Sequence, residues 1–470
     1  MLTLADVIEA LTTFRPVLAD MVITEAAIDS RQVIPGGLFV ALRGERVDGH
    51  DYVEEAFRRG ASFALVERDM PDSFSVVDLR AGFDPAVLSK LSQPFCLRVE
   101  NTLAALQRIA HYWRRKLNLR VIGITGSVGK STTKELVADV LAMRYHTLRN
   151  AGNLNNEIGL PLTMMRLGSG YSHAVLEMGF YVIGEIAFLC DIAQPQVGIV
   201  TYVGTVHAER AGSQEAIAQG KGELVEALPA DGVAILNYDN HWVRDMARRT
   251  RARVFYYGLS PEAELWADDV QSFGLEGIKF RVHYHGETLH VHVPMIGRHS
   301  VHNTLAAMAA GLVEGLTWEE ILGGLAFGNT QLRLTAVRTA SGALVLDDTY
   351  NASPESVLAA LNLLAELEGR KIAVLGDMRE LGQYERQGHD LVGTRAAEVS
   401  EILVTLGSRG HMIAEAARKA GMNPARIVEF EERRDVVAWL APRLDKNDVV
   451  LVKGSRALSM DRIVAELEAA

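Results

Sequence analysis

A glycine-rich segment at residues 123–133 constrains the fold of this chain more than any other feature. It reads G-I-T-G-S-V-G-K-S-T-T, it follows the apolar run Leu119–Ile124, and the residues after it, from Lys134 to Leu141, have a helical pattern. A strand, a glycine loop and a helix in that order direct backbone N–H groups and the positive end of a helix towards a phosphate group. The segment therefore predicts a nucleotide-binding site.

The residues of this loop have separate expected tasks. Lys130 is placed to reach the terminal phosphates, and the hydroxyl of Ser131 is placed to hold Mg2+. The match to G-x-x-x-x-G-K-[ST] is incomplete because Ile124 stands at the first glycine position. A purely structural glycine turn is the alternative, but the preceding strand and the run Gly-Lys-Ser-Thr-Thr argue against it. The expected nucleotide contacts are Thr125, Gly126, Ser127, Val128, Gly129, Lys130, Ser131 and Thr132.

Composition narrows the class of protein. The 470 residues favour about three domains, and the formal net charge of −11 argues against a general role on nucleic acid or membrane surfaces. The two cysteines, Cys96 and Cys190, are far apart and are expected to be reduced core thiols. The N-terminus lacks a signal-peptide pattern and no apolar run is long enough to span a bilayer, so we expect a cytoplasmic protein.

Short apolar runs alternate with helical patterns along the chain, which predicts an α/β protein. We expect a small α/β domain over residues 1–99, a central P-loop domain with a parallel sheet over 100–330, and a third α/β domain over 331–470. Ile278–Tyr284 and Thr288–Val293 flank His285-Gly286 and predict a hairpin. The glycine-rich stretch Gly323–Gly328 predicts a hinge before the third domain.

Polar residues near the strand ends are candidates to complete the nucleotide site. Glu177 closes a predicted strand, where a carboxylate is placed to hold Mg2+ opposite Ser131, although a solvated turn explains it equally well. His207 follows the predicted strand Val197–Val203, and a lone histidine is more often a packed or surface residue. Lys221 lies on a predicted helix, where most lysines are solvated. The run G-N-L-N-N-E-I-G-L-P offers amide groups from Asn153, Asn155 and Asn156, or is simply a polar loop.

Many short motifs, in order along nearly the whole chain, resemble those of the Mur ligases, the ATP-dependent amide ligases of peptidoglycan synthesis. The carrying segments are D-S-R at 29–31, G-L-F-V-A-L-R-G at 37–44, D-G-H-D at 48–51, T-G-S-V-G-K-S-T-T-K-E at 125–135, G-N-L-N-N-E-I-G-L-P at 152–161, L-E-M-G at 176–179, K-G-E at 221–223, G-R-H-S-V-H-N at 297–303, D-D-T-Y-N-A-S-P at 347–354, G-D-M-R-E-L-G at 376–382 and K-G-S-R at 453–456. Each motif alone is only weak evidence for the family, but the whole set in this order is specific for it.

The resemblance implies three domains: a UDP-binding unit, an ATPase and a Rossmann-like unit. It implies catalytic roles for Lys130, Glu177, His207 and Lys221, with two Mg2+ ions held by Ser131, Glu177, His207 and a Lys221 carbamoylated by CO2. It implies nucleotide contacts by His299, Asn303, Arg333 and Asp348. It implies substrate contacts by Asp29, Ser30, Arg31, Asp48, His50, Asn153, Asn156, Tyr350, Asn351 and Ser353.

Some positions depart from the family pattern. Ser131 replaces a threonine and keeps the hydroxyl, Gly37 stands where an aspartate is usual, and Leu332 precedes Arg333 where glycine is preferred. Ser353 replaces an asparagine and Arg379 an apolar residue, so the details of dipeptide recognition are open. The base that removes the amine proton is also unassigned by the sequence.

Within the family, the motif at 347–354 resembles that of the enzymes that add D-alanyl-D-alanine to UDP-N-acetylmuramoyl-tripeptide, the last cytoplasmic step of the pentapeptide precursor. The resemblance implies ATP, Mg2+ and an acyl-phosphate intermediate, and a monomer. The alternatives are a sister ligase that adds an amino acid to a peptide or folate, and a non-catalytic ATP-binding subunit. The third residue of the tripeptide, meso-diaminopimelate or lysine, and tolerance for D-alanyl-D-lactate stay open.

Overall fold

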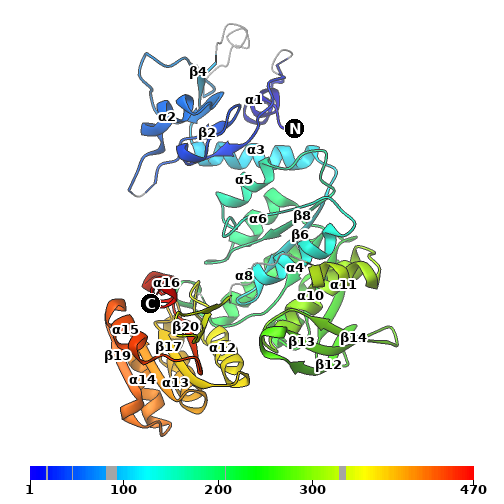
Figure 1. Cartoon of the computed structure of the whole chain (residues 1–470). Helices are drawn as coiled ribbons and strands as arrows, with labels where there is room; N and C mark the ends of the chain where they lie inside the picture. Colours follow the sequence, from blue (N-terminus) through cyan, green and yellow to red (C-terminus); the bar gives the residue numbers. More distant parts are fainter. Residues whose placement is uncertain (17–19, 45, 81–92, 207, 328–334, 470) are drawn as a thin grey trace. The chain divides into compact units, whose positions relative to one another are not determined.

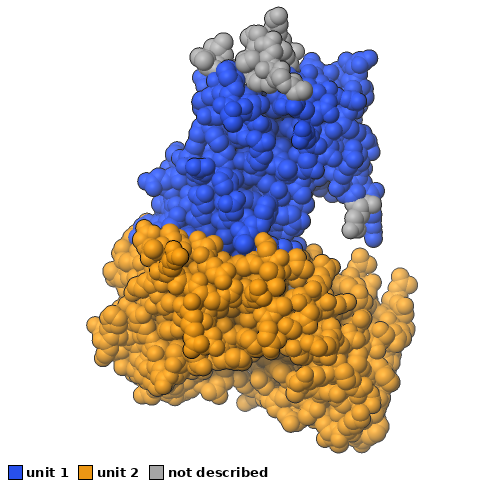
Figure 2. All heavy atoms as spheres, turned by 180° about the vertical axis from the view of Figure 1, so that it is seen from behind, with its two compact units in different colours: residues 1–123, 145–179, 185–197 blue, residues 124–144, 180–184, 198–470 orange. Residues whose placement is uncertain are grey.

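The computed structural model of the chain describes residues 1–16, 20–44, 46–80, 93–206, 208–327 and 335–469 (Figure 1). It contains three sheets, with five, nine and six strands in chain order. The chain divides into two compact units (Figure 2). Unit 1 comprises residues 1–123, 145–179 and 185–197, and unit 2 comprises residues 124–144, 180–184 and 198–470.

The first sheet lies in unit 1 and has the order β1-β2-β3-β5-β4 with parallel pairings. Its strands are β1 (Ala26–Ala27), β2 (Leu38–Val40), β3 (Phe63–Val66), β4 (Val76–Asp78) and β5 (Phe95–Arg98). The helices of this region are α1 (Leu4–Thr12), α2 (Val53–Arg58) and α3 (Thr102–Lys116). Strands β2 and β3 are fully buried, as expected for parallel strands with continuous apolar runs.

The second sheet has the order β14-β13-β12-β11-β10-β9-β6-β8-β7. Its strands are β6 (Arg120–Thr125), β7 (Thr147–Arg149), β8 (His173–Glu177), β9 (Val197–Val200), β10 (Val233–Asn237), β11 (Arg253–Gly258), β12 (Leu265–Ser272), β13 (Ile278–Tyr284) and β14 (Glu287–Val293). The associated helices are α4 (Lys130–Ala142), α5 (Gly159–Met165), α6 (Glu185–Ala193), α7 (Ala208–Ala211), α8 (Gln214–Glu226), α9 (His241–Arg244), α10 (Ser300–Val313) and α11 (Trp318–Phe327).

The expected hairpin is confirmed as β13 and β14, but the sheet is not wholly parallel. Strand β12, which the sequence analysis missed, pairs antiparallel with β13, and β13 pairs antiparallel with β14. The connections on either side of β13 are only a few residues long, and so short a connection can join only antiparallel neighbours. The central sheet is therefore parallel with an antiparallel edge.

The third sheet lies in unit 2 and has the order β15-β16-β20-β17-β18-β19. Its strands are β15 (Thr335–Arg338), β16 (Leu344–Asp347), β17 (Arg370–Gly376), β18 (Ile402–Leu406), β19 (Ile427–Phe430) and β20 (Asp448–Lys453). One buried core joins the sheet to α12 (Pro354–Glu366), α13 (Glu385–Val399) and α14 (Gly410–Lys419). A second core joins it to α15 (Arg433–Leu440) and α16 (Asp461–Ala469). Helices thus cover both faces, the doubly wound arrangement that the Rossmann-like expectation requires (Figure 1).

The predicted hinge at Gly323–Gly328 is wrong over residues 323–327, because those residues are the last part of α11. Gly324 is buried, and a Cβ atom there would lie 2.5 Å from the Cα of Val140 in α4. The glycine therefore permits close packing of two helices and supplies no flexible joint. Gly328 lies outside the described residues.

Two smaller expectations are met in the described chain. Cys96 and Cys190 are buried and form no disulfide, as expected for core thiols. Among the described residues, no helix is both long enough and apolar enough to cross a bilayer.

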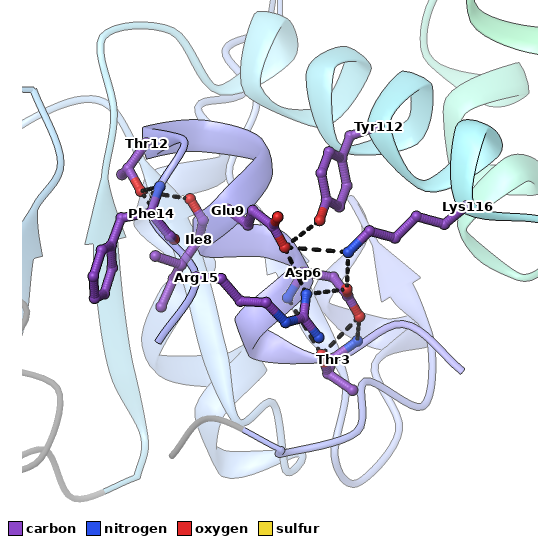
Figure 3. Close-up of polar contacts among 9 residues, drawn as sticks. All are labelled: Thr3, Asp6, Ile8, Glu9, Thr12, Phe14, Arg15, Tyr112 and Lys116. Carbon is purple, nitrogen blue, oxygen red and sulfur yellow. Dashed lines mark hydrogen bonds and ion pairs between the residues drawn. The ribbon is translucent and has the colours of Figure 1, made fainter. Parts of the chain in front are cut away.

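Helix α1 is held to α3 by a group of charged side chains in unit 1 (Figure 3). The carboxylate of Asp6 accepts hydrogen bonds from Arg15 at 2.8 Å and from Lys116 at 3.1 Å, and it also bonds Thr3. Burial raises the pKa of Asp6, but these hydrogen bonds outweigh the burial and lower the pKa to about 2. Asp6 is therefore charged at neutral pH.

We expect Asp6→Asn to destabilise the protein by roughly 1–2 kcal/mol at pH 7, and by less as the pH falls. The folded-state pKa of about 2 lies below the ordinary value of 3.8, so the stabilisation is complete above the ordinary value and is lost between about pH 4 and pH 2. Denaturant unfolding of wild type and Asp6→Asn at pH 7, 5 and 3 measures this. A stability difference that stays constant or grows on acidification would contradict the assignment.

Candidate active site

The glycine loop has the predicted strand–loop–helix geometry: β6 ends at Thr125 and α4 begins at Lys130. Gly126 has φ +153° and Gly129 has φ +85°, values that side chains other than glycine rarely adopt. A Cβ atom on Gly126 would overlap the hydroxyl of Thr201, and one on Gly129 would lie 2.5 Å from the Oδ1 of Asn303. Both glycines are therefore required by backbone conformation and by space.

Neighbouring backbone holds this loop in place. The N–H of Ser127 donates to the carbonyl of Tyr202 at 2.6 Å, and the N–H of Gly204 donates to the Oγ of Ser127 at 3.0 Å. The hydroxyl of Thr201 donates to the carbonyl of Val128 at 2.6 Å. The segment after β9 thus fixes the loop from one side, as preorganised phosphate binding requires.

A cavity of about 150 Å³ in unit 2 opens beside the loop. It is lined by most of the predicted nucleotide contacts and by part of the predicted dipeptide loop: Ser127, Val128, Gly129, Lys130, Ser131, Thr132, His299, Asn303, Asp348, Asn351 and Ser353. Residues from the second sheet region and from the third thus meet at one cavity. Thr125 and Gly126, which precede the lining residues of the loop, do not line the cavity.

Two lysines approach the loop carbonyls. The Nζ of Lys130 donates to the carbonyl of Gly126 at 2.7 Å. The Nζ of Lys221 donates to the same carbonyl at 3.0 Å, and it lies 4.8 Å from the ring centre of Phe180. Lys221 has no exposed surface. The alternative of an ordinary solvated helical lysine is therefore excluded, and the catalytic role implied by the resemblance stays a prediction.

Glu177 ends β8 in unit 1 and is 2% exposed. The side chain of Asn155 donates to its Oε1 at 2.9 Å, and the side chain of Asn150 pairs with its backbone on both sides, at 2.9 and 3.1 Å. The carboxylate is thus oriented by amides. The Oδ1 of Asn156 accepts the N–H of Gly159 at 2.9 Å, which serves the start of α5. The carbonyl of Asn153 accepts the N–H of Asn155.

The predicted uridine-nucleotide residues lie in unit 1. Asp29 caps a short 3₁₀ helix and pairs with the exposed Arg31, and Ser30 is buried within that turn. Asp48 caps the next 3₁₀ helix, Gly49–Tyr52, and its Oδ1 lies 2.6 Å from the Nδ1 of His50. The Nε2 of His50 accepts the N–H of Glu67, so both ring nitrogens of this buried histidine have partners within the protein. Direct contact of these residues with a ligand stays a prediction.

The predicted dipeptide loop follows β16 in the third sheet region. The carboxylate of Asp348 pairs with the buried Lys453 at 2.7 Å, and Lys453 also donates to the carbonyl of Asn351. The guanidinium of Arg456 lies over the ring of Tyr350, and Ser353 caps α12. The pairing of K-G-S-R with D-D-T-Y-N fixes the shape of this loop.

Two predicted site residues, His207 and Arg333, lie outside the described residues. Among the residues that the structure does describe, no three histidine, cysteine, aspartate or glutamate side chains cluster as ligands for a metal ion. The expected Mg2+ ligands are of mixed type: a hydroxyl, a carboxylate, the imidazole of His207 and a modified lysine. The hard oxygen donors among them suit Mg2+.

Models of known protein families match three consecutive parts of the chain. Residues 22–114 match the Mur ligase family catalytic domain, residues 124–311 the Mur ligase middle domain, and residues 332–456 the Mur ligase glutamate ligase domain. The UDP-N-acetylmuramoyl-tripeptide–D-alanyl-D-alanine ligase of Bacillus subtilis (strain 168) is 35% identical over 460 residues, which cover 97% of this chain and 95% of that protein. The chain belongs to the Mur ligase family.

Solved structures of Mur ligases agree with this membership. A crystal structure of MurF from Acinetobacter baumannii superposes with a TM-score of 0.84 at 28% identity, covering 99% of this chain and 98% of that one. MurF ligase from Thermotoga maritima in complex with ADP gives a TM-score of 0.80 at 27% identity, covering 96% and 98% of the two chains. The three-sheet architecture is therefore that of MurF structures.

Sequence reasoning missed, or named without their partners, several residues that organise the site of this Mur ligase. Asn150 and Asn155 hold Glu177, and Lys453 holds Asp348. Asn155 is one of the three candidate amides in the run at 152–161, but the sequence could not say which of them faces the carboxylate, and Asn150 lies before that run and was missed. Lys453 had its own motif, K-G-S-R, and only the pairing of β16 with β20 brings it to Asp348.

Glu355 in the first turn of α12 was also missed. Its Oε1 accepts hydrogen bonds from the N–H and the hydroxyl of Thr205, at 3.1 and 3.3 Å, and its other oxygen is buried with no hydrogen-bond partner among the described residues. Burial raises the pKa of Tyr202, and the Glu355 carboxylate raises it further. Since Gly204 bonds Ser127, Glu355 connects α12 to the phosphate loop through two residues.

We expect Glu355→Ala to lower kcat by about tenfold or more with little change in Tm, because Thr205 and the loop beside it would lose their anchor. Glu355→Gln should keep most of the activity, since its amide oxygen can accept the same two hydrogen bonds. Steady-state kinetics of both variants test this, with Glu366→Ala, an exposed glutamate of the same helix, as the control. Wild-type rates in Glu355→Ala would contradict the anchoring role.

Proposed function

We propose that this Mur ligase joins D-alanyl-D-alanine to UDP-N-acetylmuramoyl-tripeptide, with ATP hydrolysed to ADP and phosphate. The observation that carries the proposal is the cavity lined both by the phosphate loop and by Asp348, Asn351 and Ser353 of the D-D-T-Y-N-A-S-P motif. The full-length relationship to the Bacillus subtilis ligase of that activity supports it.

The chemical problem is that a carboxylate is a poor electrophile. A carboxylate oxygen of the tripeptide attacks the γ-phosphorus of ATP, the bond to ADP breaks, and an acyl phosphate forms. The amine of the dipeptide then attacks the acyl carbon, phosphate leaves with the bonding electron pair, and the nitrogen loses a proton to give the amide. The first step brings like charges together, so the main task of the protein is to position and neutralise them.

In this proposal, individual groups of the chain position and neutralise these charges. The N–H groups at the start of α4 face the phosphates, and the ammonium of Lys130 turns from the carbonyl of Gly126 to the transferring phosphoryl group. Asn303 packs against Gly129, and we propose that it and His299 contact the adenine. Arg333 and Asp348 complete the nucleotide contacts in the proposal, and Asn351 and Ser353 bind the dipeptide.

We propose Mg2+ as the required metal, with two ions held by Ser131, Glu177, His207 and a carbamoylated Lys221. Bound Mg2+ neutralises phosphate charge and orients the oxygens that react. The donor chemistry fits: Asn155 orients the Glu177 carboxylate, and Ser131 lies in the first turn of the helix after the loop. Carbamoylation would convert the cation of Lys221, which has no exposed surface, into an anion.

We further propose domain boundaries at 1–99, 100–330 and 331–470, because each range contains one of the three sheets. The uridine nucleotide binds the first of these ranges, through Asp29, Ser30, Arg31, Asp48 and His50, and Asn153 and Asn156 contact the substrate. The protein works in the cytoplasm, where ATP is available, as a monomer. These assignments transfer the roles implied by the family resemblance to the matching residues of this chain.

Phosphate release with UDP-N-acetylmuramoyl-tripeptide and a panel of acceptors tests the function. Amide formation with D-alanyl-D-alanine, and not with single amino acids, is the expected result. A rate that is highest with an amino acid acceptor would indicate a sister ligase. ATP turnover that is equal with and without any acceptor would indicate a nucleotide-binding protein that is no ligase.

A further inference from the structure

A short apolar segment is exposed in unit 2 near the phosphate loop. It comprises Tyr181, Val182 and Ile183, which are 41%, 44% and 47% exposed. Three consecutive large apolar residues at the surface are unusual in a soluble enzyme unless they bind something. We call them the apolar segment below.

Both ends of the apolar segment are fixed to α8 beside Lys221. Before it, the buried ring of Phe180 packs against Gly220 and lies 4.8 Å from the Nζ of Lys221. After it, the N–H of Gly184 donates to the Oε1 of Glu223 at 2.6 Å. Because Lys221 itself bonds the phosphate-loop carbonyl of Gly126, the apolar segment is anchored next to the phosphate end of the nucleotide site.

An arginine adjoins the apolar segment. The guanidinium of Arg210, an exposed residue of α7, lies 4.8 Å from the ring centre of Tyr181. In the described part of the chain, Arg210 forms no ion pair. Among the residues that the structure describes, the site therefore presents an apolar surface that ends in a cation without an ion-pair partner.

We propose that the apolar segment and Arg210 bind the side chain of the tripeptide's third residue, and that they select a side chain that ends in a carboxylate. The proposal rests on the proposed function and names its substrate more closely: a diamino diacid of the meso-diaminopimelate type, in preference to lysine. The carboxyl group to be activated belongs to that same third residue, so its side chain must extend from the phosphate end of the site.

The side chains of meso-diaminopimelate and lysine differ in the charged groups at their far ends. Both carry a chain of methylene groups that can lie on Val182 and Ile183. The diamino diacid ends in a carbon with an ammonium and a carboxylate, and lysine ends in an ammonium alone. A guanidinium binds a carboxylate through two parallel hydrogen bonds, whereas a lone ammonium beside it would be repelled.

The test compares kcat/KM for the two tripeptide substrates, with D-alanyl-D-alanine as the acceptor. Wild type should prefer the diaminopimelate tripeptide by about tenfold or more. Arg210→Ala should bring the two values close together, chiefly through a higher KM for the diaminopimelate tripeptide. Arg210→Glu should reverse the preference. The matched control is Arg443→Ala, which removes an arginine stacked on Trp439 in the third sheet region and should leave the preference unchanged.

Each outcome separates this inference from the function on which it rests. Equal kcat/KM values in wild type, a wild-type preference for lysine, or a preference unaltered in both Arg210 variants would overturn the inference and leave the ligase function intact. Failure of wild type to ligate either tripeptide would overturn the proposed function itself. Arg210 is exposed, so unchanged thermal unfolding of its variants is expected and can be checked directly.

Discussion

Lys130→Ala is expected to lower the rate of ATP-dependent ligation by about 10³-fold. The side chain is the loop's cation at the start of α4, and it lines the cavity. Phosphoryl transfer to a carboxylate gathers negative charge at one place, and removal of a single group that stabilises transition-state charge costs about 10²–10³ or more. Quench-flow measurement of ADP and amide formation gives the rate of the chemical step separately from substrate binding.

The loss must come from chemistry and not from unfolding. Lys130 donates to the carbonyls of Gly126 and Ser127, and these accept water once the side chain is removed, so Tm should change little. Lys279→Ala, which removes an exposed lysine on β13, is the control and should retain full activity. Pentapeptide formation by Lys130→Ala at the wild-type rate would refute the ATP-dependent mechanism.

Lys221→Met is expected to lower ligation by about 10²-fold or more, and the wild-type enzyme should depend on dissolved CO2. Methionine keeps most of the volume of a side chain that has no exposed surface, so the core is disturbed as little as possible. It cannot become an anion. Wild-type activity should fall in CO2-depleted buffer and return with bicarbonate, whereas Lys221→Met should not respond to bicarbonate.

A direct signal separates carbamoylation from a simple need for a buried lysine. With ¹³C-bicarbonate, wild type should give a carbamate resonance that Lys221→Met lacks. Lys221→Glu, which supplies a fixed carboxylate, should be more active than Lys221→Met and should ignore bicarbonate. A wild-type rate independent of CO2, without a carbamate signal, would show that Lys221 acts as the amine that bonds the Gly126 carbonyl.

Some secondary-structure elements could be predicted because the sequence patterns that indicate them span only a few neighbouring residues. The hairpin of β13 and β14 and the strand–loop–helix of β6 and α4 follow from periodicity, turn residues and glycine. The hinge prediction failed at Gly324 because glycine has two uses, flexibility and close approach, and only the neighbouring Val140 decides between them. Strand β12 was missed because its exposed, polar alternation becomes a strand only beside β11 and β13.

The sequence by itself determined the α/β class, the phosphate loop with Lys130 and Ser131, and membership in a family of ligases, since these depend on residue types at fixed short spacing. The tertiary structure alone decided that Lys221 is buried on the Gly126 carbonyl, that Asn155 faces Glu177, and that Arg210 stacks on Tyr181. Burial and pairing depend on residues far apart in the chain, and their partners are chosen by the packing of whole helices and sheets. The spacing of residues along the chain therefore does not predict these tertiary contacts.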